Sequence, residues 1–199
     1  MTSLEELSQK LEEGQGVVLP TETVYGLFAK ALMPSSVDLV YDLKERSRDK
    51  AMNLNVASYD DIIRFSKNQP SYLKDLYTAF LPGPLTIILQ ANDQVPAWIN
   101  SGLDSVGFRL PSHPVTRALI AQHGPLIGPS ANKSGQESGK HFAAIMQEFD
   151  QQVLGYQDDV FLTGRDSTIL DLSGHRAKIL RQGAVSKQDL VAVIPELQF

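Results

Sequence analysis

Apolar residues along the chain recur with two spacings, one typical of helices and one typical of strands. Leu4, Leu7 and Leu11 share one helical face, and Ser3 and Glu6 have the spacing of a capping box. Similar patterns predict helices over residues 3–13, from Ser35 or Ser36 to a turn that carries Lys44, and over 59–66, 71–80, 114–122, 141–149 and from Ser186 onward. Short apolar or β-branched runs predict strands over residues 16–19, 53–57, 85–90, 105–110, 125–128, 159–162, 167–172 and 178–181.

These elements alternate without an internal repeat, a low-complexity tract or a linker that would mark a domain boundary. Residues 173–176 have the composition of a hairpin turn between the last two strands, so antiparallel pairs are expected beside helical crossovers. We therefore predict a single α/β domain over residues 1–199, built on a twisted, mixed β-sheet that is flanked by helices.

Composition narrows the classes of function. Of 199 residues, 42% are apolar and 21% charged, and the net charge of −5 disfavours a surface built wholly for nucleic acid. The chain has no cysteine, which excludes disulfides, thiolate nucleophiles and cysteine zinc sites. An acidic N-terminus unlike a signal peptide, and no apolar run of ~18 residues, predict a soluble, cytoplasmic protein with no membrane partner. The phosphate-binding loop, the dinucleotide fingerprint, the zinc-protease motif and the hydrolase elbow are all missing.

The segment Pro20–Leu27, read PTETVYGL, follows a short buried run and is the first candidate site. Pro20 has no N–H to donate, so we expect it to end the ladder pairing of the preceding strand. Hydroxyl groups crowded at the end of a buried strand suit the floor of a ligand pocket. The alternative is a tight turn whose threonine hydroxyls satisfy one another.

Three further stretches carry candidate chemistry, each with a plainer alternative. The basic cluster of residues 44–48 could bind an anion, or be a solvated helix end. Residues 129–135, read PSANKSG, could turn N–H groups and hydroxyls toward a phosphate, or form an ordinary turn. Arg109, on a strand with apolar neighbours, needs an anionic partner that is either an internal acid or a bound ligand. Three histidines are expected to lie at the surface or in turns and to have no role in the site: His123, His141 and His175.

The order of these stretches is more informative than any one of them. PTETVYGL, a Lys-x-Arg pair, FLPGPLT, VGFRLPSHP, PSANKSG, DSTILDL and RQGA follow one another along the chain. In this combination the chain resembles the YrdC/Sua5 family, the threonylcarbamoyl-adenylate synthases, from about Gly14 to Ala184. It is similar to the short form of the family, and the resemblance implies no second Sua5-type domain after Ala184.

The resemblance implies a reaction and a set of site residues. Members of the family join L-threonine, bicarbonate or carbon dioxide, and ATP into threonylcarbamoyl-AMP and pyrophosphate, with Mg²⁺ held by the ATP phosphates. The positions that match the family's nucleotide-binding and catalytic set are Lys44, Arg46, Ser130 and Asn132. The other expected ATP-binding residues are Arg48 and Arg181. The positions that match the threonine pocket are Thr21, Thr23, Tyr25, Arg109 and Ser167.

Two alternatives to the synthase stay open on the sequence. In the family, other proteins receive the product and transfer the threonylcarbamoyl group to adenosine 37 of tRNA. The same basic residues could serve direct contact with tRNA or double-stranded RNA, which would make the chain a binding module without synthase activity. A paralogue on the same fold could instead use a different acyl or carbamoyl substrate.

Overall fold

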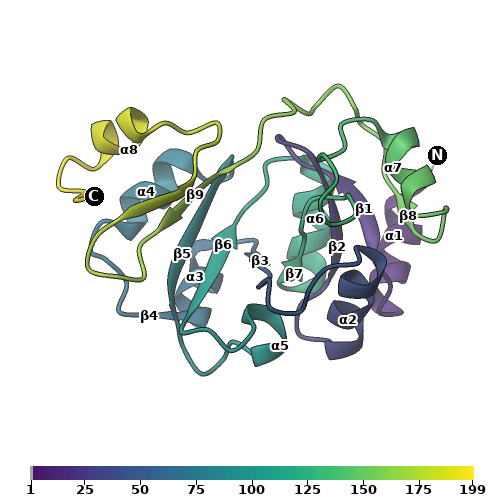
Figure 1. Ribbon diagram of the computed structural model, residues 1–199, viewed down its shortest axis with the longest axis horizontal. Helices are drawn as coiled ribbons and strands as arrows, with labels where there is room; N and C mark the ends of the chain where they lie inside the picture. Colours follow the sequence, from purple (N-terminus) through teal and green to yellow (C-terminus); the bar gives the residue numbers. More distant parts are fainter. Residues whose placement is uncertain (1) are drawn as a thin grey trace.

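The computed structural model describes residues 2–199, and its centre is one mixed sheet of ten strands. The strand order is β10-β9-β5-β6-β3-β7-β2-β1-β8, and β4 pairs with β5 outside this path (Figure 1). The strands are β1 Val17–Pro20, β2 Tyr25–Lys30, β3 Leu54–Asn55, β4 Ser66–Lys67, β5 Leu85–Ala91, β6 Ser105–Arg109, β7 Leu126–Ile127, β8 Leu154–Gly155, β9 Thr168–Asp171 and β10 Lys178–Arg181. The helices are α1 Leu4–Glu12, α2 Pro34–Leu43, α3 Tyr59–Phe65, α4 Leu73–Phe80, α5 Ala97–Asn100, α6 Pro114–His123, α7 Phe142–Glu148 and α8 Lys187–Val193. The predicted fold class, a mixed sheet flanked by helices, is confirmed.

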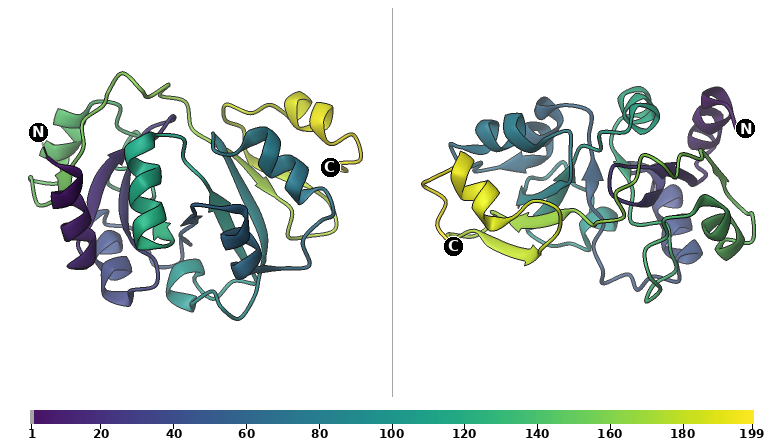
Figure 2. Two further views of the ribbon diagram at one scale, coloured as in Figure 1. Left: turned by 180° about the vertical axis from the view of Figure 1, so that it is seen from behind. Right: turned by 90° about the horizontal axis from the view of Figure 1, so that it is seen from above.

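Helices cover both faces of the sheet around β1 and β2. Seen from above, α1 and α6 lie on one side of these strands, while α2 and α7 lie on the other (Figure 2). Val17 and Leu19 pack with α1 and α6, and Val18 between them packs with the cluster on the opposite face. A strand buried on both faces loses the alternation of polar and apolar residues, which is why the sequence shows only a continuous apolar run here.

The hairpin of β1 and β2 corrects the prediction for Pro20. Pro20 is the last residue of β1 and lies opposite Tyr25 in the antiparallel register, so pairing does not end at Leu19. Strand β2 was not predicted at all. Its residues are buried almost throughout, and Gly26 interrupts the β-branched and aromatic pattern that usually identifies a strand.

Other boundaries differ where local signals were weak. The predicted strand over residues 159–162 is wrong, because this stretch crosses between distant parts of the sheet without pairing. Strand β8 forms earlier and pairs in parallel with β1. Helix α2 begins at Pro34 after Met33, and Ser36, one of the two predicted caps, is buried and donates its hydroxyl to the Gly14 carbonyl. The short elements β4 and α5 were not predicted.

Local helix signals were confirmed where a capping box was present. Serine caps with reciprocal acidic partners begin α1, α3 and α8, at Ser3, Ser58 and Ser186. No helix within residues 2–199 is both long enough and apolar enough to cross a membrane.

Replacing the cap of α3 is expected to destabilise the fold measurably. Ser58 accepts a hydrogen bond from the Asp61 N–H at 3.3 Å, and Asp61 accepts one from the Ser58 N–H at 3.2 Å. We expect Ser58→Ala to lower the free energy of unfolding by about 1 kcal/mol in urea denaturation. Ser71→Ala, two residues before α4, is the matched control and should change it little. Equal stability of both variants would contradict this role for the cap.

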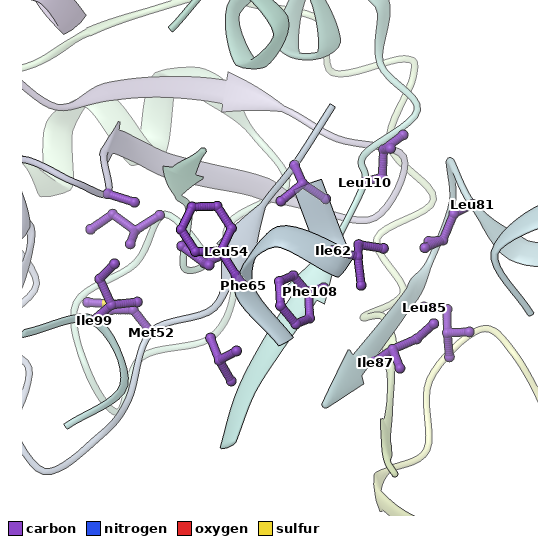
Figure 3. Packing of buried hydrophobic residues seen from close by; sticks show 14 of the residues in the cluster. Met52, Leu54, Ile62, Phe65, Leu81, Leu85, Ile87, Ile99, Phe108 and Leu110 are labelled. Atoms are coloured by element: carbon purple, nitrogen blue, oxygen red, sulfur yellow. The ribbon is translucent and has the colours of Figure 1, made fainter. Parts of the chain in front are cut away.

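The packing of β6 determines where the polar face of the sheet lies. Figure 3 shows Ile62 and Phe65 of α3 beside Phe108 of β6 in the main core. Successive side chains on a strand point to opposite faces. With Phe108 buried against α3, the next residue, Arg109, points to the opposite face of the sheet, where a polar cleft opens.

Candidate functional site

A cleft of about 350 Å³ lies on this face, with polar residues from many elements around it. Its lining joins the β1–β2 turn, the segment after α2, the middle strands β3, β5 and β6, the segment after β7, and the start of β9 and end of β10. The polar and charged residues that line it are Thr21, Tyr25, Arg46, Asn53, Asn55, Thr86, Arg109, Ser130, Asp166, Ser167 and Arg181. Seven of the predicted site residues therefore meet at one cavity, although they lie up to 160 positions apart in sequence (181 minus 21).

Lys44 lies directly behind this cavity. It caps the C-terminus of α2, and its Nζ donates hydrogen bonds to the backbone carbonyls of Ser130 and Asn132. The Ser134 N–H in turn donates to the Lys44 carbonyl at 2.8 Å. Lys44 is 1% exposed, and this burial, with the nearby charge of Arg46, lowers its pKa to about 8. One buried ammonium thus joins the Lys-x-Arg segment to the PSANKSG segment.

The rest of the basic cluster divides between the cleft and solvent. Arg46 lines the cleft, and its Nη2 donates to the Ala51 carbonyl at 2.9 Å, so its guanidinium is oriented by its own loop. Arg48 is half exposed and pairs with Asp38 and with Asp42, the latter at 2.7 Å. Arg48 does not line the cleft. It matches the alternative interpretation of the basic cluster, in which these residues form a solvated helix end. Its predicted contact with ATP finds no support in this geometry.

The anionic partner of Arg109 is Glu22, which the sequence analysis did not single out. Arg109 Nη2 donates to Glu22 Oε1 at 2.7 Å and to Thr23 Oγ1 at 2.8 Å. Each partner of the ion pair is 14% exposed. Burial acts to raise the pKa of Glu22, but the Arg109 charge and the Ser112 N–H together lower it. Within residues 2–199, Arg109 Nε is buried and has no hydrogen-bond partner, while the residue itself lines the cleft.

The hydroxyls of PTETVYGL are partly satisfied within the turn, as the alternative interpretation expected. Thr21 Oγ1 donates to the Val24 carbonyl at 2.6 Å and lies 2.9 Å from Thr23 Oγ1. Thr23 is fully buried and supports Arg109 from behind, while Thr21 lines the cleft. These threonines thus orient the arginine as well as the turn.

Tyr25 anchors the segment that connects β8 to β9. Its hydroxyl donates to Asp159 Oδ1 at 2.6 Å and accepts from the Asp158 N–H at 2.9 Å. Burial and the Asp159 carboxylate raise the pKa of Tyr25, so the phenol stays protonated. Figure 1 shows this segment, in yellow-green, running from β8 across the molecule toward β9. Residues 166 and 167, at the end of this segment, line the cleft.

Ser167 and Arg181 form the wall on that far side. Arg181 Nη2 donates to Ser167 Oγ at 3.0 Å, and its Nε donates to the Ser167 carbonyl at 2.9 Å. Thr86 Oγ1 of β5 lies 3.2 Å from the same Ser167 hydroxyl. Partial burial lowers the pKa of Arg181, an effect that the charge of Asp166 opposes and that of Arg109 reinforces. Ser167 and Arg181, which the sequence placed in different subsites, are therefore in direct contact.

Sequence reasoning missed several residues of the cleft and misplaced one histidine. The lining residues that were not assigned to the site are Asn53, Asn55, Thr86 and Asp166, and Glu22 beside the cleft was not assigned either. Two of them had a usable signal: Glu22 lies between two predicted site threonines, and Asp166 begins the DSTILDL motif next to Ser167. The expectation that His123 lies at the surface is wrong. Its side chain is fully buried, with Nδ1 2.7 Å from Glu12 Oε1 and Nε2 2.9 Å from Ser8 Oγ, and it joins α6 to α1.

Comparison with known proteins shows similarity to one family over most of the chain. The family model Sua5_yciO_yrdC, described as "Telomere recombination", matches residues 9–183. The chain is 33% identical over 190 residues to the threonylcarbamoyl-AMP synthase of Pyrococcus abyssi, covering 94% of this chain and 56% of that protein. It is 34% identical over 187 residues to the threonylcarbamoyl-AMP synthase of Bacillus subtilis, covering 92% of this chain and 54% of that protein.

A solved structure shows the same arrangement of elements. The crystal structure of P. abyssi Sua5 complexed with L-threonine superimposes with a TM-score of 0.89 at 30% identity, covering all of this chain and 60% of that one. The chain thus spans a little over half the length of the relatives described here. Because the family model covers most of the sequence, the chain belongs to the Sua5/YciO/YrdC family.

Proposed function

We propose that the chain is an L-threonylcarbamoyladenylate synthase, a nucleotidyltransferase that makes threonylcarbamoyl-AMP and pyrophosphate from L-threonine, bicarbonate or carbon dioxide, and ATP. The observation that carries the proposal is the convergence of Arg46, Arg109 and Arg181 with hydroxyl groups on one cleft. Two curated relatives carry the name threonylcarbamoyl-AMP synthase, and the Sua5 structure with the same fold holds L-threonine.

The residue types suit this chemistry. A carbamate on the threonine amine must attack the α-phosphate of ATP while pyrophosphate leaves, so both reactants are anions. Such a reaction needs placed cations and N–H donors more than it needs a protein nucleophile. Arg46, Arg181 and the buried ammonium of Lys44 would neutralise the phosphates, and Ser130 would contribute its hydroxyl. The guanidinium of Arg109, which lines the cleft, would receive the carboxylate of threonine.

We propose that Mg²⁺ enters with the nucleotide. Residues 2–199 contain no group of three or more histidine or acidic side chains placed to hold a metal ion. The cleft offers mainly arginines and hydroxyls, a donor set that fits phosphate oxygens. Mg²⁺ is commonly bound through substrate phosphates and water, and it would supply further neutralisation of the triphosphate.

The proposal also implies where the product goes and in which compartment the enzyme works. Threonylcarbamoyl-AMP would pass to separate transferase proteins that modify tRNA in the cytoplasm. The alternative of an RNA-binding module is not favoured, because the relatives are named as synthases and the net charge of this chain is −5.

The proposal is tested by measuring pyrophosphate release from ATP with L-threonine and bicarbonate, omitting each substrate in turn. We expect release that needs all three, together with an AMP-linked product. Valine in place of threonine should be a poor substrate, because a site built to bind a hydroxyl is left with an unpaired polar group. Release that is independent of threonine would assign a different acceptor, and no release beside an active control enzyme would overturn the proposal.

Affinity for ATP is expected to weaken as the pH rises through about 8, the pKa of Lys44. Below that pH its ammonium is charged, and above it the folded chain loses the proton that an unfolded chain keeps up to 10.5. Phosphate groups lose their last proton near pH ~6, so their charge stays constant over this range. The free energy of unfolding should rise with pH between about 8 and 10.5, because in this range the unfolded chain binds more protons at Lys44 than the folded chain does.

The measurement is the Kd of ATP between pH 7 and 9.5, by titration calorimetry. Lys44→Met, which has no proton to lose, should bind weakly with a flat profile. A constant Kd for the wild-type protein across this range would contradict the electrostatic role of Lys44.

A further inference from the structure

Positive side chains outnumber negative ones in the lining of the cleft. Within the described residues 2–199, its lining contains Arg46, Arg109 and Arg181 but a single carboxylate, Asp166. A carboxylate repels phosphates and carbonate, so it does not serve the anionic parts of the proposed reaction. Its presence among three cations calls for a separate explanation.

The backbone of Asp166 is firmly held. Its carbonyl accepts a hydrogen bond from the Ala184 N–H at 3.1 Å. A Cβ on Gly183 would lie 2.2 Å from the same carbonyl oxygen, so the close approach of these two segments requires glycine there. The next residue, Ser167, is held by Arg181 through two hydrogen bonds. Asp166 therefore occupies a defined place two residues before β9.

Its carboxylate, in contrast, is uncommitted. None of the ion pairs or side-chain hydrogen bonds found among residues 2–199 uses it, although it lies close enough to Arg181 for its charge to act on that guanidinium. The other acid at this site, Glu22, is already bound by Arg109 and by the Ser112 N–H. Asp166 is thus the acid of the cleft that is available to a ligand.

The sheet places Asp166 and Arg109 on either side of one strand. Strand β5 lies between β9 and β6, and its register sets Leu85 opposite Thr168 and Ile87 opposite Phe108. By these registers Arg109, next to Phe108, falls near Thr86, whereas Asp166 lies just before β9 and beyond the Leu85 end of β5. The two backbones are therefore separated by two strand spacings and by a further offset along the strands. Both residues nevertheless line the same cleft of about 350 Å³.

We propose that Asp166 binds the α-ammonium group of the amino-acid substrate, opposite the Arg109 guanidinium that binds its carboxylate. The inference rests on the proposed function and extends it, because it makes the cleft selective for a zwitterion over a simple hydroxy acid. Ammonium–carboxylate pairing in a cleft of limited water access is charge-assisted and directional. Arg109 and Asp166 would together set the orientation of the amine toward the nucleotide.

The test compares two ligands that differ in the amine alone. Binding of L-threonine and of (R)-3-hydroxybutyrate, which keeps the carboxylate and the hydroxyl, is measured by calorimetry without ATP or metal. Asp166→Asn keeps the size and the backbone contacts of the residue, and Asp93→Asn, on an exposed loop, is the control for loss of one negative charge. We expect Asp166→Asn to weaken threonine binding at least tenfold, to leave 3-hydroxybutyrate binding unchanged, and Asp93→Asn to change neither.

The outcomes separate this inference from the function on which it rests. Equal weakening of both ligands by Asp166→Asn would make the residue structural and overturn the inference. So would unchanged threonine binding in that variant. Wild-type protein that binds no threonine would overturn the proposed function, and the inference with it.

Discussion

Lys44→Ala is expected to lower the turnover of pyrophosphate release by a hundredfold or more. The substitution removes a buried ammonium together with the donor for the carbonyls of Ser130 and Asn132. The Asn132 carbonyl then loses this donor, while the Ser130 carbonyl keeps only the Asn132 N–H. The segment that carries the Ser130 hydroxyl into the cleft stays joined to α2 only by the backbone bond from the Ser134 N–H to the carbonyl of residue 44. Loss of one placed donor in a transition-state site costs about 10²–10³ in turnover, and here charge and loop position are lost together.

Two further variants show which property matters. Lys44→Met keeps most of the apolar stem and removes only the charge and the donors, so it should be nearly as inactive as Lys44→Ala. Lys10→Ala, which removes an exposed lysine of α1, is the matched control and should keep full turnover. Wild-type turnover in Lys44→Met would remove this ammonium from the mechanism.

Arg109→Met is expected to lower kcat/KM for threonine by about 10²–10³, the scale of a lost charge-assisted donor. The loss should appear mainly in KM, because Arg109 is placed to hold the substrate carboxylate rather than the phosphates. The variant should also unfold more easily. Removing one member of a buried ion pair costs roughly 3–5 kcal/mol, and Glu22 and Arg109 are each only 14% exposed.

A double variant separates the two effects. Glu22→Gln added to Arg109→Met removes the stranded carboxylate and should recover much of the stability without restoring threonine binding. Arg117→Met, on the exposed side of α6, is the control and should change neither quantity. Recovery of threonine affinity in the double variant would show that Arg109 acts through the fold and not through the ligand.

Much of the fold follows from local patterns in the sequence. The capping boxes at Ser3, Ser58 and Ser186 mark true helix starts, because both hydrogen bonds of the box join residues three apart. The strand predicted over residues 105–110 forms with Phe108 in the core and Arg109 on the other face, since alternation is a property of the strand itself. The ordered motifs also indicated the family, which the family model confirmed.

The site depended on contacts that no local pattern contains. Glu22 meets Arg109 across 87 positions, and Lys44 meets Ser130 and Asn132 across 86 and 88. Nothing near Arg48 in the sequence separates it from Arg46, yet only Arg46 turns into the cleft.

Sequence alone therefore determined the starts of the helices that have capping boxes, the alternating faces of strand β6 and the residue types of a cationic cleft. The tertiary structure decided which acid neutralises Arg109, which acid stays free in Asp166, and that Pro20 continues into a hairpin with an unpredicted β2. The physical reason is the distance along the sequence over which each kind of interaction acts. Capping and side-chain alternation act within a few residues, whereas the pairing of buried charges depends on which distant segments the sheet brings side by side.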